Sequence, residues 1–161
     1  MPDTVFQYWR STARYREVGD PDGDAWTFYD DGTVVHTYYA VGYKDPVRTI
    51  AVAESVELAD ALREYIDAHD AVIKAIPVSL NNGSLDGYYD IFTFGDHRIT
   101  GINVTEKDPE AMKSEDPFYA ERYAENMVQE AQLVAVFREL YGIIRHYLPE
   151  VHIRIRSAGI E

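Results

Sequence analysis

The sequence contains no cysteine, and this absence excludes several kinds of site. Disulfide bonds, thiolate metal ligands and a cysteine nucleophile all need the missing residue. A chain without disulfides also fits a reducing compartment. The first residues lack the basic and apolar regions of a secretory signal, and no apolar run approaches the roughly 20 residues of a membrane helix. We therefore expect a cytoplasmic protein that makes no membrane contact.

Short catalytic and metal-binding motifs are also missing. The chain has no P-loop, no G-x-G-x-x-G and no G-x-S-x-G, and its histidines form neither H-x-H nor H-E-x-x-H. Asp20, Asp22 and Asp24 have the alternate spacing of calcium ligands, but Ala25 stands where such a loop needs glycine. We expect a solvated turn at this place, and we expect no catalytic residue, metal or cofactor.

Basic residues are scarce: the chain has 15 of them and 28 acidic residues, which gives a net charge of -13. Residues 52–116 alone carry 14 acidic and 5 basic residues, so most of the excess lies there. Such a surface repels nucleic acid, because phosphate contacts need lysine and arginine. The same charge would attract a basic protein partner. Simple solubility is the alternative explanation of the charge.

The remaining composition is that of an ordinary globular protein. The 161 residues are 46% hydrophobic and 27% charged, which is typical of one domain and excludes disorder of the whole chain. No repeat, low-complexity segment or glycine- and serine-rich linker divides the sequence. We expect a single α+β domain over residues 1–161.

The spacing of apolar residues predicts an antiparallel sheet, made of a meander and a hairpin, with two main helices packed on one face. Strands are expected near residues 5–9, 26–29, 33–43, 47–52, 88–94, 98–104 and 151–155, with residues 15–18 continuing the first. Turns are expected at 19–24, 30–32, 81–83 and 95–97. Ser55 should cap a helix over about 56–76, and Asp116 with Pro117 should start a second helix that ends near 147. Residues 106–116 show no periodicity and are expected to form a loop.

Tyrosine is abundant, with 13 residues. Neighbouring residues on a strand point to opposite faces, so one member of each pair Tyr38–Tyr39 and Tyr88–Tyr89 should be exposed or half-exposed. Exposed tyrosines are favoured anchors of protein interfaces. Tyrosine also occurs in strands for structural reasons, with its ring on the core and its hydroxyl near water.

Carboxylates accompany the aromatic residues in three places. An arginine can stack on an aromatic ring and pair with a carboxylate at once, so such clusters suit a basic protein surface. The predicted partner-binding residues are Tyr29, Asp30 and Asp31; Asp86, Tyr88, Tyr89 and Asp90; and Glu115, Asp116 and Tyr119.

Residues 26–32, Trp-Thr-Phe-Tyr-Asp-Asp-Gly, form a short aromatic strand that enters an acidic hairpin turn. Together with the small size, the acidity and the many tyrosines of the chain, this segment makes the sequence resemble in general style the immunity proteins of bacterial polymorphic toxin systems. The resemblance implies an inhibitor that binds a basic toxin domain, often a nuclease, and blocks its active site. It assigns no particular residue.

Two other functions stay open. A small enzyme or ligand-binding domain would have a tyrosine-lined pocket between sheet and helices, with a perturbed histidine or carboxylate. A structural component, such as a phage-assembly protein, would form a defined oligomer. The apolar band of the helix over 117–147 could then serve as a homodimer face.

Overall fold

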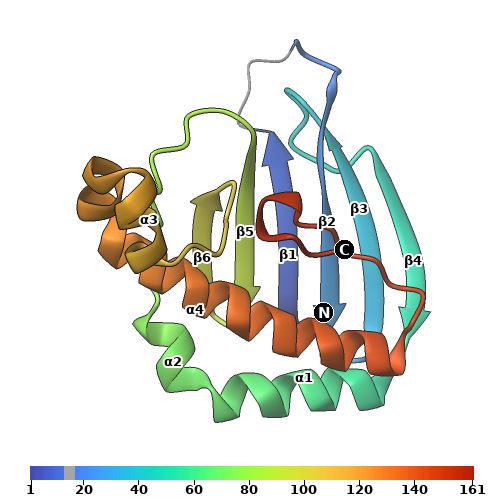
Figure 1. The fold of residues 1–161 in the computed structure, drawn as a ribbon. Coiled ribbons are helices and arrows are strands. Elements are labelled where there is room, and N and C mark those ends of the chain that lie inside the picture. The colour runs from blue at the N-terminus through green and yellow to red at the C-terminus, as the bar shows by residue number, and fades with distance from the viewer. Residues whose placement is uncertain (13–16) are drawn as a thin grey trace.

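A six-stranded antiparallel sheet forms the centre of the fold (Figure 1). The computed structural model describes residues 1–12 and 17–161. Its strands lie in the order β4-β3-β2-β1-β5-β6, and each neighbouring pair is antiparallel. The first strand of the chain is thus a central strand, between β2 and β5. The strands are β1 (Thr4–Thr12), β2 (Pro21–Tyr29), β3 (Thr33–Ala40), β4 (Arg48–Glu54), β5 (Tyr88–Phe94) and β6 (His97–Ile102).

The two main helices cross the same face of the sheet, as Figure 1 shows for α1 and α4. The predicted α+β fold, with an antiparallel sheet and helices on one face, is therefore confirmed. No helix among the described residues is long and apolar enough to cross a bilayer. The helices are α1 (Val56–Ala68), α2 (Asp70–Ala75), α3 (Pro109–Glu115) and α4 (Pro117–Tyr147), and a 3-10 turn covers Arg156–Ala158.

The core between sheet and helices is built on aromatic rings. The ring of Phe6 on β1 lies 5.2 Å from that of Phe94 on β5 and 6.0 Å from that of Phe137 on α4. Phe137 also meets Phe92 edge to face at 5.5 Å. The Phe6 contacts are tilted and the Phe92–Phe137 contact is edge to face, so none is a face-to-face sandwich, the arrangement that aromatic rings avoid. They hold the middle of α4 over β1 and β5.

The segment after α4 continues this core. Its side chains alternate between buried and exposed, as the period-two pattern predicts. The predicted last strand is nevertheless wrong, because the segment pairs with no described strand of the sheet and its bridge is internal, between Ile155 and Ile160. The hydroxyl of Tyr141 on α4 accepts a hydrogen bond from the Ile153 amide at 2.9 Å. Period two indicates an extended chain but does not specify what that chain packs against.

Two further expectations about the helices are wrong. The helix expected over 56–76 is interrupted at His69, whose backbone (φ -109°, ψ 17°) ends α1 and precedes α2. The loop expected over 106–116 contains α3, which begins where the Asp108 side chain accepts a hydrogen bond from the Glu110 amide. This helix buries no residue, so it leaves no apolar period in the sequence.

The expected turn over 19–24 is shorter than predicted. β2 already begins at Pro21, and Gly23 pairs with Ser11 of β1. The turn residues are therefore partly strand residues, held by pairing with β1. Residues 15 and 16 of the strand expected over 15–18 lie outside the described residues, and residues 17 and 18 are not part of a strand.

Candidate functional site

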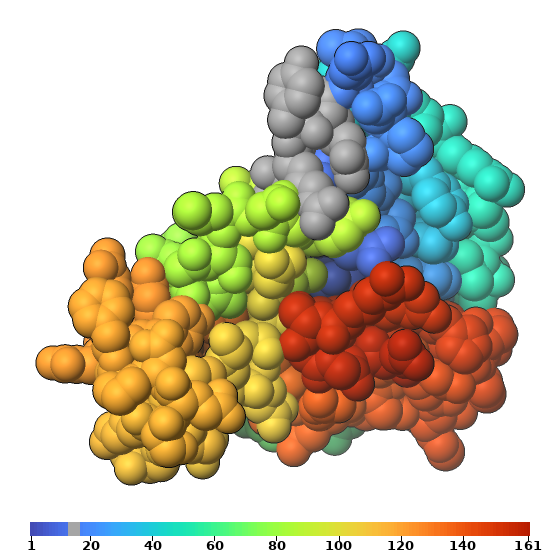
Figure 2. Space-filling view, turned by 45° about the horizontal axis from the view of Figure 1, so that its top comes forward, coloured from blue at the N-terminus to red at the C-terminus, as the bar shows by residue number. Residues whose placement is uncertain are grey.

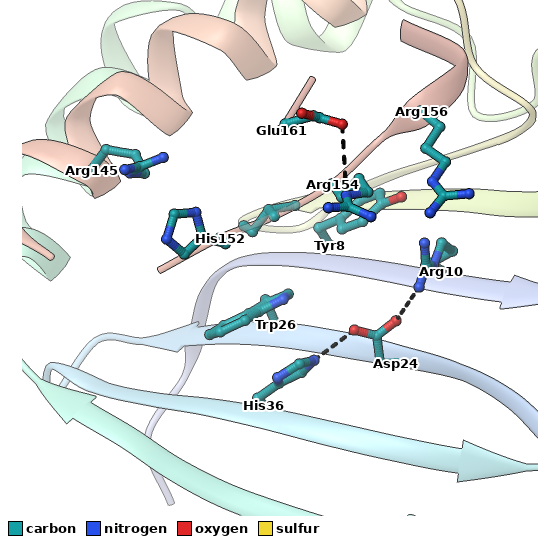
Figure 3. A pocket seen from close by; sticks show the side chains of 11 residues that line it. Tyr8, Arg10, Asp24, Trp26, His36, Arg145, His152, Arg154, Arg156 and Glu161 are labelled. Atoms are coloured by element: carbon teal, nitrogen blue, oxygen red, sulfur yellow. Dashed lines mark hydrogen bonds and ion pairs between the residues drawn. The ribbon is translucent and has the colours of Figure 1, made fainter. Parts of the chain in front are cut away.

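A cleft of about 610 Å³ lies between the sheet and the segment after α4 (Figure 3). Figure 2 shows the C-terminal residues, in red, at the surface beside strand residues in blue. We call this site the arginine cleft. Strands β1 to β3 supply Tyr8, Arg10, Asp24, Trp26 and His36, while α4 and the C-terminal segment supply Arg145, His152, Ile153, Arg154, Arg156 and Glu161.

The cleft lies where the row of side chains along β1 changes from apolar to polar. Phe6, Tyr8 and Arg10 alternate onto the helix-covered face of the sheet. Phe6 and Tyr8 lie under Phe137 of α4, but Arg10 lies beyond this aromatic contact. The strand register places Asp24 opposite Arg10. Alternation and register thus bring polar groups together at the end of the sheet that the helix leaves open.

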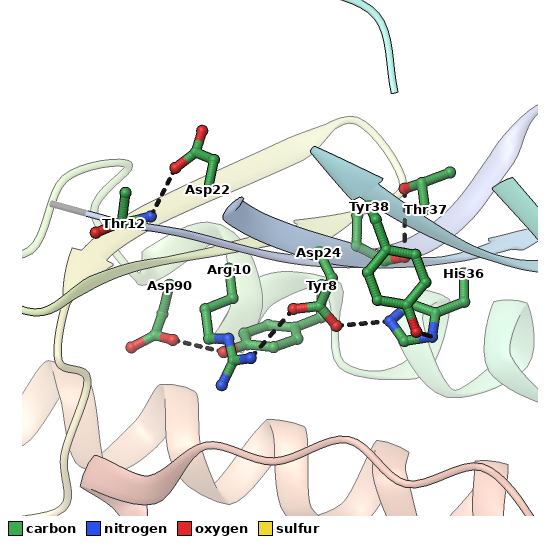
Figure 4. Close-up of polar contacts among 10 residues, drawn as sticks. Tyr8, Arg10, Thr12, Asp22, Asp24, His36, Thr37, Tyr38 and Asp90 are labelled. Atoms are coloured by element: carbon green, nitrogen blue, oxygen red, sulfur yellow. Dashed lines mark hydrogen bonds and ion pairs between the residues drawn. The ribbon is translucent and has the colours of Figure 1, made fainter. Parts of the chain in front are cut away.

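A chain of hydrogen bonds organises the floor of the cleft (Figure 4). Asp24 accepts a hydrogen bond from Arg10 at 3.3 Å and one from His36 Nε2 at 2.6 Å. Because a carboxylate only accepts, the His36 proton lies on Nε2, and Nδ1 can accept from the Tyr38 hydroxyl at 3.3 Å. The His36 ring also stacks on Trp26, with centroids 4.0 Å apart. These contacts fix the orientation of the floor residues.

A second polar pair supports Tyr8. The Tyr8 hydroxyl donates to Asp90 Oδ1 at 2.5 Å, and Asp90 Oδ2 accepts from the Val104 amide at 2.8 Å. Burial raises the pKa of Asp90 above its usual value. Burial and the neighbouring Asp90 carboxylate raise the pKa of Tyr8 well above its usual value. Tyr8 therefore remains a protonated donor near neutral pH, held toward Asp90.

The arginines of the cleft have donors to spare. Arg10 Nε and Arg145 Nε are buried and have no acceptor among the described residues. Arg154 Nε lies 4.0 Å from Glu161, the longest ion pair among the described residues of the cleft, and Arg156 pairs with no described carboxylate. A buried donor without a partner costs about 1–3 kcal/mol. The exposed guanidinium groups of Arg154 and Arg156 are open to a hydrogen-bond acceptor that a ligand would bring.

The charge of the cleft is opposite to that of the whole chain. Four arginines line it against two carboxylates, although the chain carries -13. Asp24 is already bonded on both oxygens. Guanidinium groups bind carboxylates and phosphates through paired hydrogen bonds, so the arrangement can hold an anion. Among residues 1–12 and 17–161, no three carboxylate or histidine side chains gather as a metal site would require.

The predicted partner-binding residues lie at two separate ends of the sheet. On β1, Thr4 pairs with Tyr29 and Thr12 pairs with Tyr88, so Tyr29 lies about 26 Å along the strand from Tyr88 at ~3.3 Å per residue. In the Tyr29 group, Asp30 pairs with Arg63 at 3.6 Å. Asp31 accepts a hydrogen bond from the Thr33 amide, which lowers the pKa of its carboxyl.

The other two predicted groups adjoin each other. The Tyr119 hydroxyl donates to the Asn82 carbonyl, and Asn82 donates to the Asn103 carbonyl. Asn103 in turn donates to the Asp86 carbonyl at 2.6 Å and accepts from the Tyr88 amide. These bonds connect the start of α4 to the start of β5.

Individual members of these two groups have different surroundings. Tyr88 and Tyr89 are 39% and 38% exposed. Asp116 caps α4 by accepting from the Tyr119 amide, while Glu115, at the end of α3, is exposed. Asp90 faces the interior, because it alternates away from Tyr89, and its carboxylate is bonded to Tyr8 and Val104. Asp90 therefore presents no carboxylate to a partner.

Sequence reasoning missed the arginine cleft. The available signal was the alternation of His152, Arg154 and Arg156 along the last segment, which places these side chains on one side. Their partners, Arg10 and Asp24, lie at the other end of the chain. Comparison of the sequence with protein-family models gives no match, and comparison with curated proteins gives no significant similarity.

Proposed function

We propose that this protein binds a small organic anion in the arginine cleft. The observation that carries the proposal is the lining of the cleft, where four arginines stand against two carboxylates and Arg156 pairs with no carboxylate of the described residues. A carboxylate or phosphate of a ligand supplies acceptors for such donors. The volume of about 610 Å³ falls within the range of about 300–1,000 Å³ that small-molecule sites occupy.

The ligand-binding alternative from the sequence thus gains support from two features of the cleft. Tyr8 lines it, and Asp90, whose pKa burial raises, holds the Tyr8 hydroxyl. Arg145, Arg154 and Arg156 would bind the charge of the ligand. Asp24 would keep Arg10 in place.

Isothermal titration with a panel of carboxylates and phosphates tests the proposal. Arg156→Ala removes an exposed cleft arginine and should weaken the best ligand about 10- to 100-fold, since a charged hydrogen bond contributes about 1.5–3 kcal/mol. Arg122→Ala removes the same charge from an exposed position of α4 outside the cleft and should leave affinity unchanged. Raising the salt concentration should weaken binding. The proposal fails if no anion binds, or if both variants weaken binding equally.

A second candidate function is the inhibition of a basic protein by the two adjoining acidic and aromatic groups. The specific observation in its favour is the hydrogen-bonded connection between Tyr119, Asn82, Asn103 and Asp86, which joins groups far apart in sequence. Phe118, in the first turn of α4, is 71% exposed beside these carboxylates. An immunity-type inhibitor would use such a surface against a nuclease domain.

Biolayer interferometry against a panel of basic nuclease domains tests this candidate. Phe118→Ala and Glu115→Lys should each weaken a bound complex at least about tenfold, because truncating an interface anchor costs about 2 kcal/mol or more. Glu57→Lys makes the same charge change on an exposed position of α1 and serves as the control. Equal losses in Glu115→Lys and Glu57→Lys would leave only a general charge effect and exclude this surface.

A further inference from the structure

The arginine cleft has two cationic ends. Arg145 and Glu161 also line a neighbouring hollow of about 310 Å³. Arg10, Arg154 and Arg156 also line a different hollow, of about 230 Å³. The two sets share no residue, and the Arg154–Glu161 pair at 4.0 Å lies between them. Figure 3 shows Arg145 well apart from Arg10 and Arg156, with His152 and Arg154 between them and Trp26 lower in the view.

Each end contains a buried donor that has no acceptor among the described residues. At one end this donor is Arg145 Nε, and at the other it is Arg10 Nε. The Arg10 contact with Asp24 uses a terminal nitrogen and leaves Nε without a partner. Both Nε atoms are enclosed by protein atoms, so a ligand in the cleft would bind the terminal nitrogens of these guanidinium groups. A ligand with one acidic group can bind only one end, whereas a ligand with an acidic group at each end can bind both.

One wall of the cleft between these ends is aromatic. Trp26 stacks on His36 with an angle of 17° between the rings, which presents a flat aromatic surface. Ile153, from the C-terminal segment, lines the same space and is 1% exposed. Aromatic surfaces of this kind bind flat rings by stacking.

We infer that the ligand is an elongated dianion with an acidic group at each end and a flat middle. This inference rests on the proposed function and narrows its ligand class. One acidic group binds Arg145, the other binds Arg10 and Arg156, and the middle lies along Trp26. Of the carboxylates near these ends, Asp24 is bonded to Arg10 and His36, and Asp90 is bonded to Tyr8 and Val104. Glu161 lines the Arg145 end but lies 4.0 Å from Arg154.

Ligands that differ by a single charge test whether the second acidic group contributes to binding. Benzene-1,4-dicarboxylate and its monomethyl ester share the ring and the length but differ by one charge. Naphthalene-2,6-dicarboxylate and biphenyl-4,4′-dicarboxylate lengthen the middle. At low salt, isothermal titration should give at least about tenfold tighter binding for the best dianion than for its monoester, an advantage of about 1.4 kcal/mol.

Cleft variants assign this advantage to the two ends. Arg145→Met should reduce the ratio of the two affinities, dianion to monoester, to less than about threefold. Arg156→Ala, which removes a charge at the other end of the cleft, should also reduce this ratio. Arg122→Ala should preserve it. Arg156 is exposed, so its variant keeps the test valid if Arg145→Met fails to fold.

The possible outcomes distinguish this inference from the proposed function. Equal affinity for dianions and monoesters, with binding that still depends on Arg156, would overturn the dianion inference and leave anion binding in place. Absence of binding by every anion would overturn both. A dianion preference that survives both cleft variants would also overturn the inference, because the second charge would then bind elsewhere.

Discussion

Glu130 should make the stability of this protein depend on pH in an unusual direction. Its side chain is 1% exposed, in the middle of α4. The carboxylate accepts hydrogen bonds from Asn82 at 3.1 Å, from the Thr105 amide at 3.3 Å and from Asn126 at 2.6 Å. Burial nevertheless outweighs these bonds and raises the pKa of Glu130 from 4.5 to about 6. The folded protein therefore binds this proton more tightly than the unfolded chain does.

The magnitude follows from the two pKa values. The stabilisation from this proton is fully present below pH 4.5 and is lost as the pH rises through about 6. At about 1.4 kcal/mol per pKa unit, the loss amounts to about 2 kcal/mol. Glu130→Gln has nearly the same shape but does not titrate. The free energy of unfolding of the native protein, minus that of the variant, should therefore fall by about 2 kcal/mol between pH 4.5 and pH 7.5.

Urea denaturation of both proteins across this pH range provides the measurement. Taking the difference cancels groups common to both proteins, such as Asp90, whose pKa burial also raises. Glu125→Gln, at an exposed position of the same helix, should give a difference that does not vary with pH. A constant difference for Glu130→Gln, or one that grows with pH, would refute the reasoning.

Two further substitutions test the packing around the cleft, and urea denaturation measures both. Tyr8→Phe should lower the free energy of unfolding by about 1–3 kcal/mol, because it removes the donor that satisfies buried Asp90; Tyr43→Phe, at an exposed position, should have little effect, and equal stability of the two variants would contradict this role. Phe137→Ala should cost about 3–5 kcal/mol, because its fully buried ring joins α4 to β1 and β5. A loss under about 1 kcal/mol would mean that the helix is held by other contacts.

Local signals explain why much of the fold was predictable. The Asp116 cap and Pro117 start α4 at the expected place, and the helix ends at Tyr147, before Pro149. Gly32 has the positive φ of 91° that its acidic hairpin turn requires. Each of these features depends on residues within one turn of each other, so the sequence carries the information directly. The break at His69 has no such signal, because the apolar spacing continues across it.

Residues that are close in sequence, or chemically similar, do not always lie on the same surface of this protein. Tyr89 and Asp90 are neighbours, yet strand alternation exposes one and buries the other against Tyr8. The Tyr29 group, although chemically similar, lies at the opposite end of the sheet from Tyr88. Strand register decided both outcomes, and register depends on pairing between distant segments.

The sequence by itself determined the composition, the net charge of -13, the antiparallel α+β class and the bounds of α4. Only the tertiary structure decided where the positive charges gather. Arg10 comes from the first strand, while Arg145, Arg154 and Arg156 come from the end of the chain. They meet because the C-terminal segment packs on the helix-covered face of the sheet rather than pairing as a strand. A sum of charges along the chain does not reveal such a cleft, since electrostatic interaction depends on distance in space.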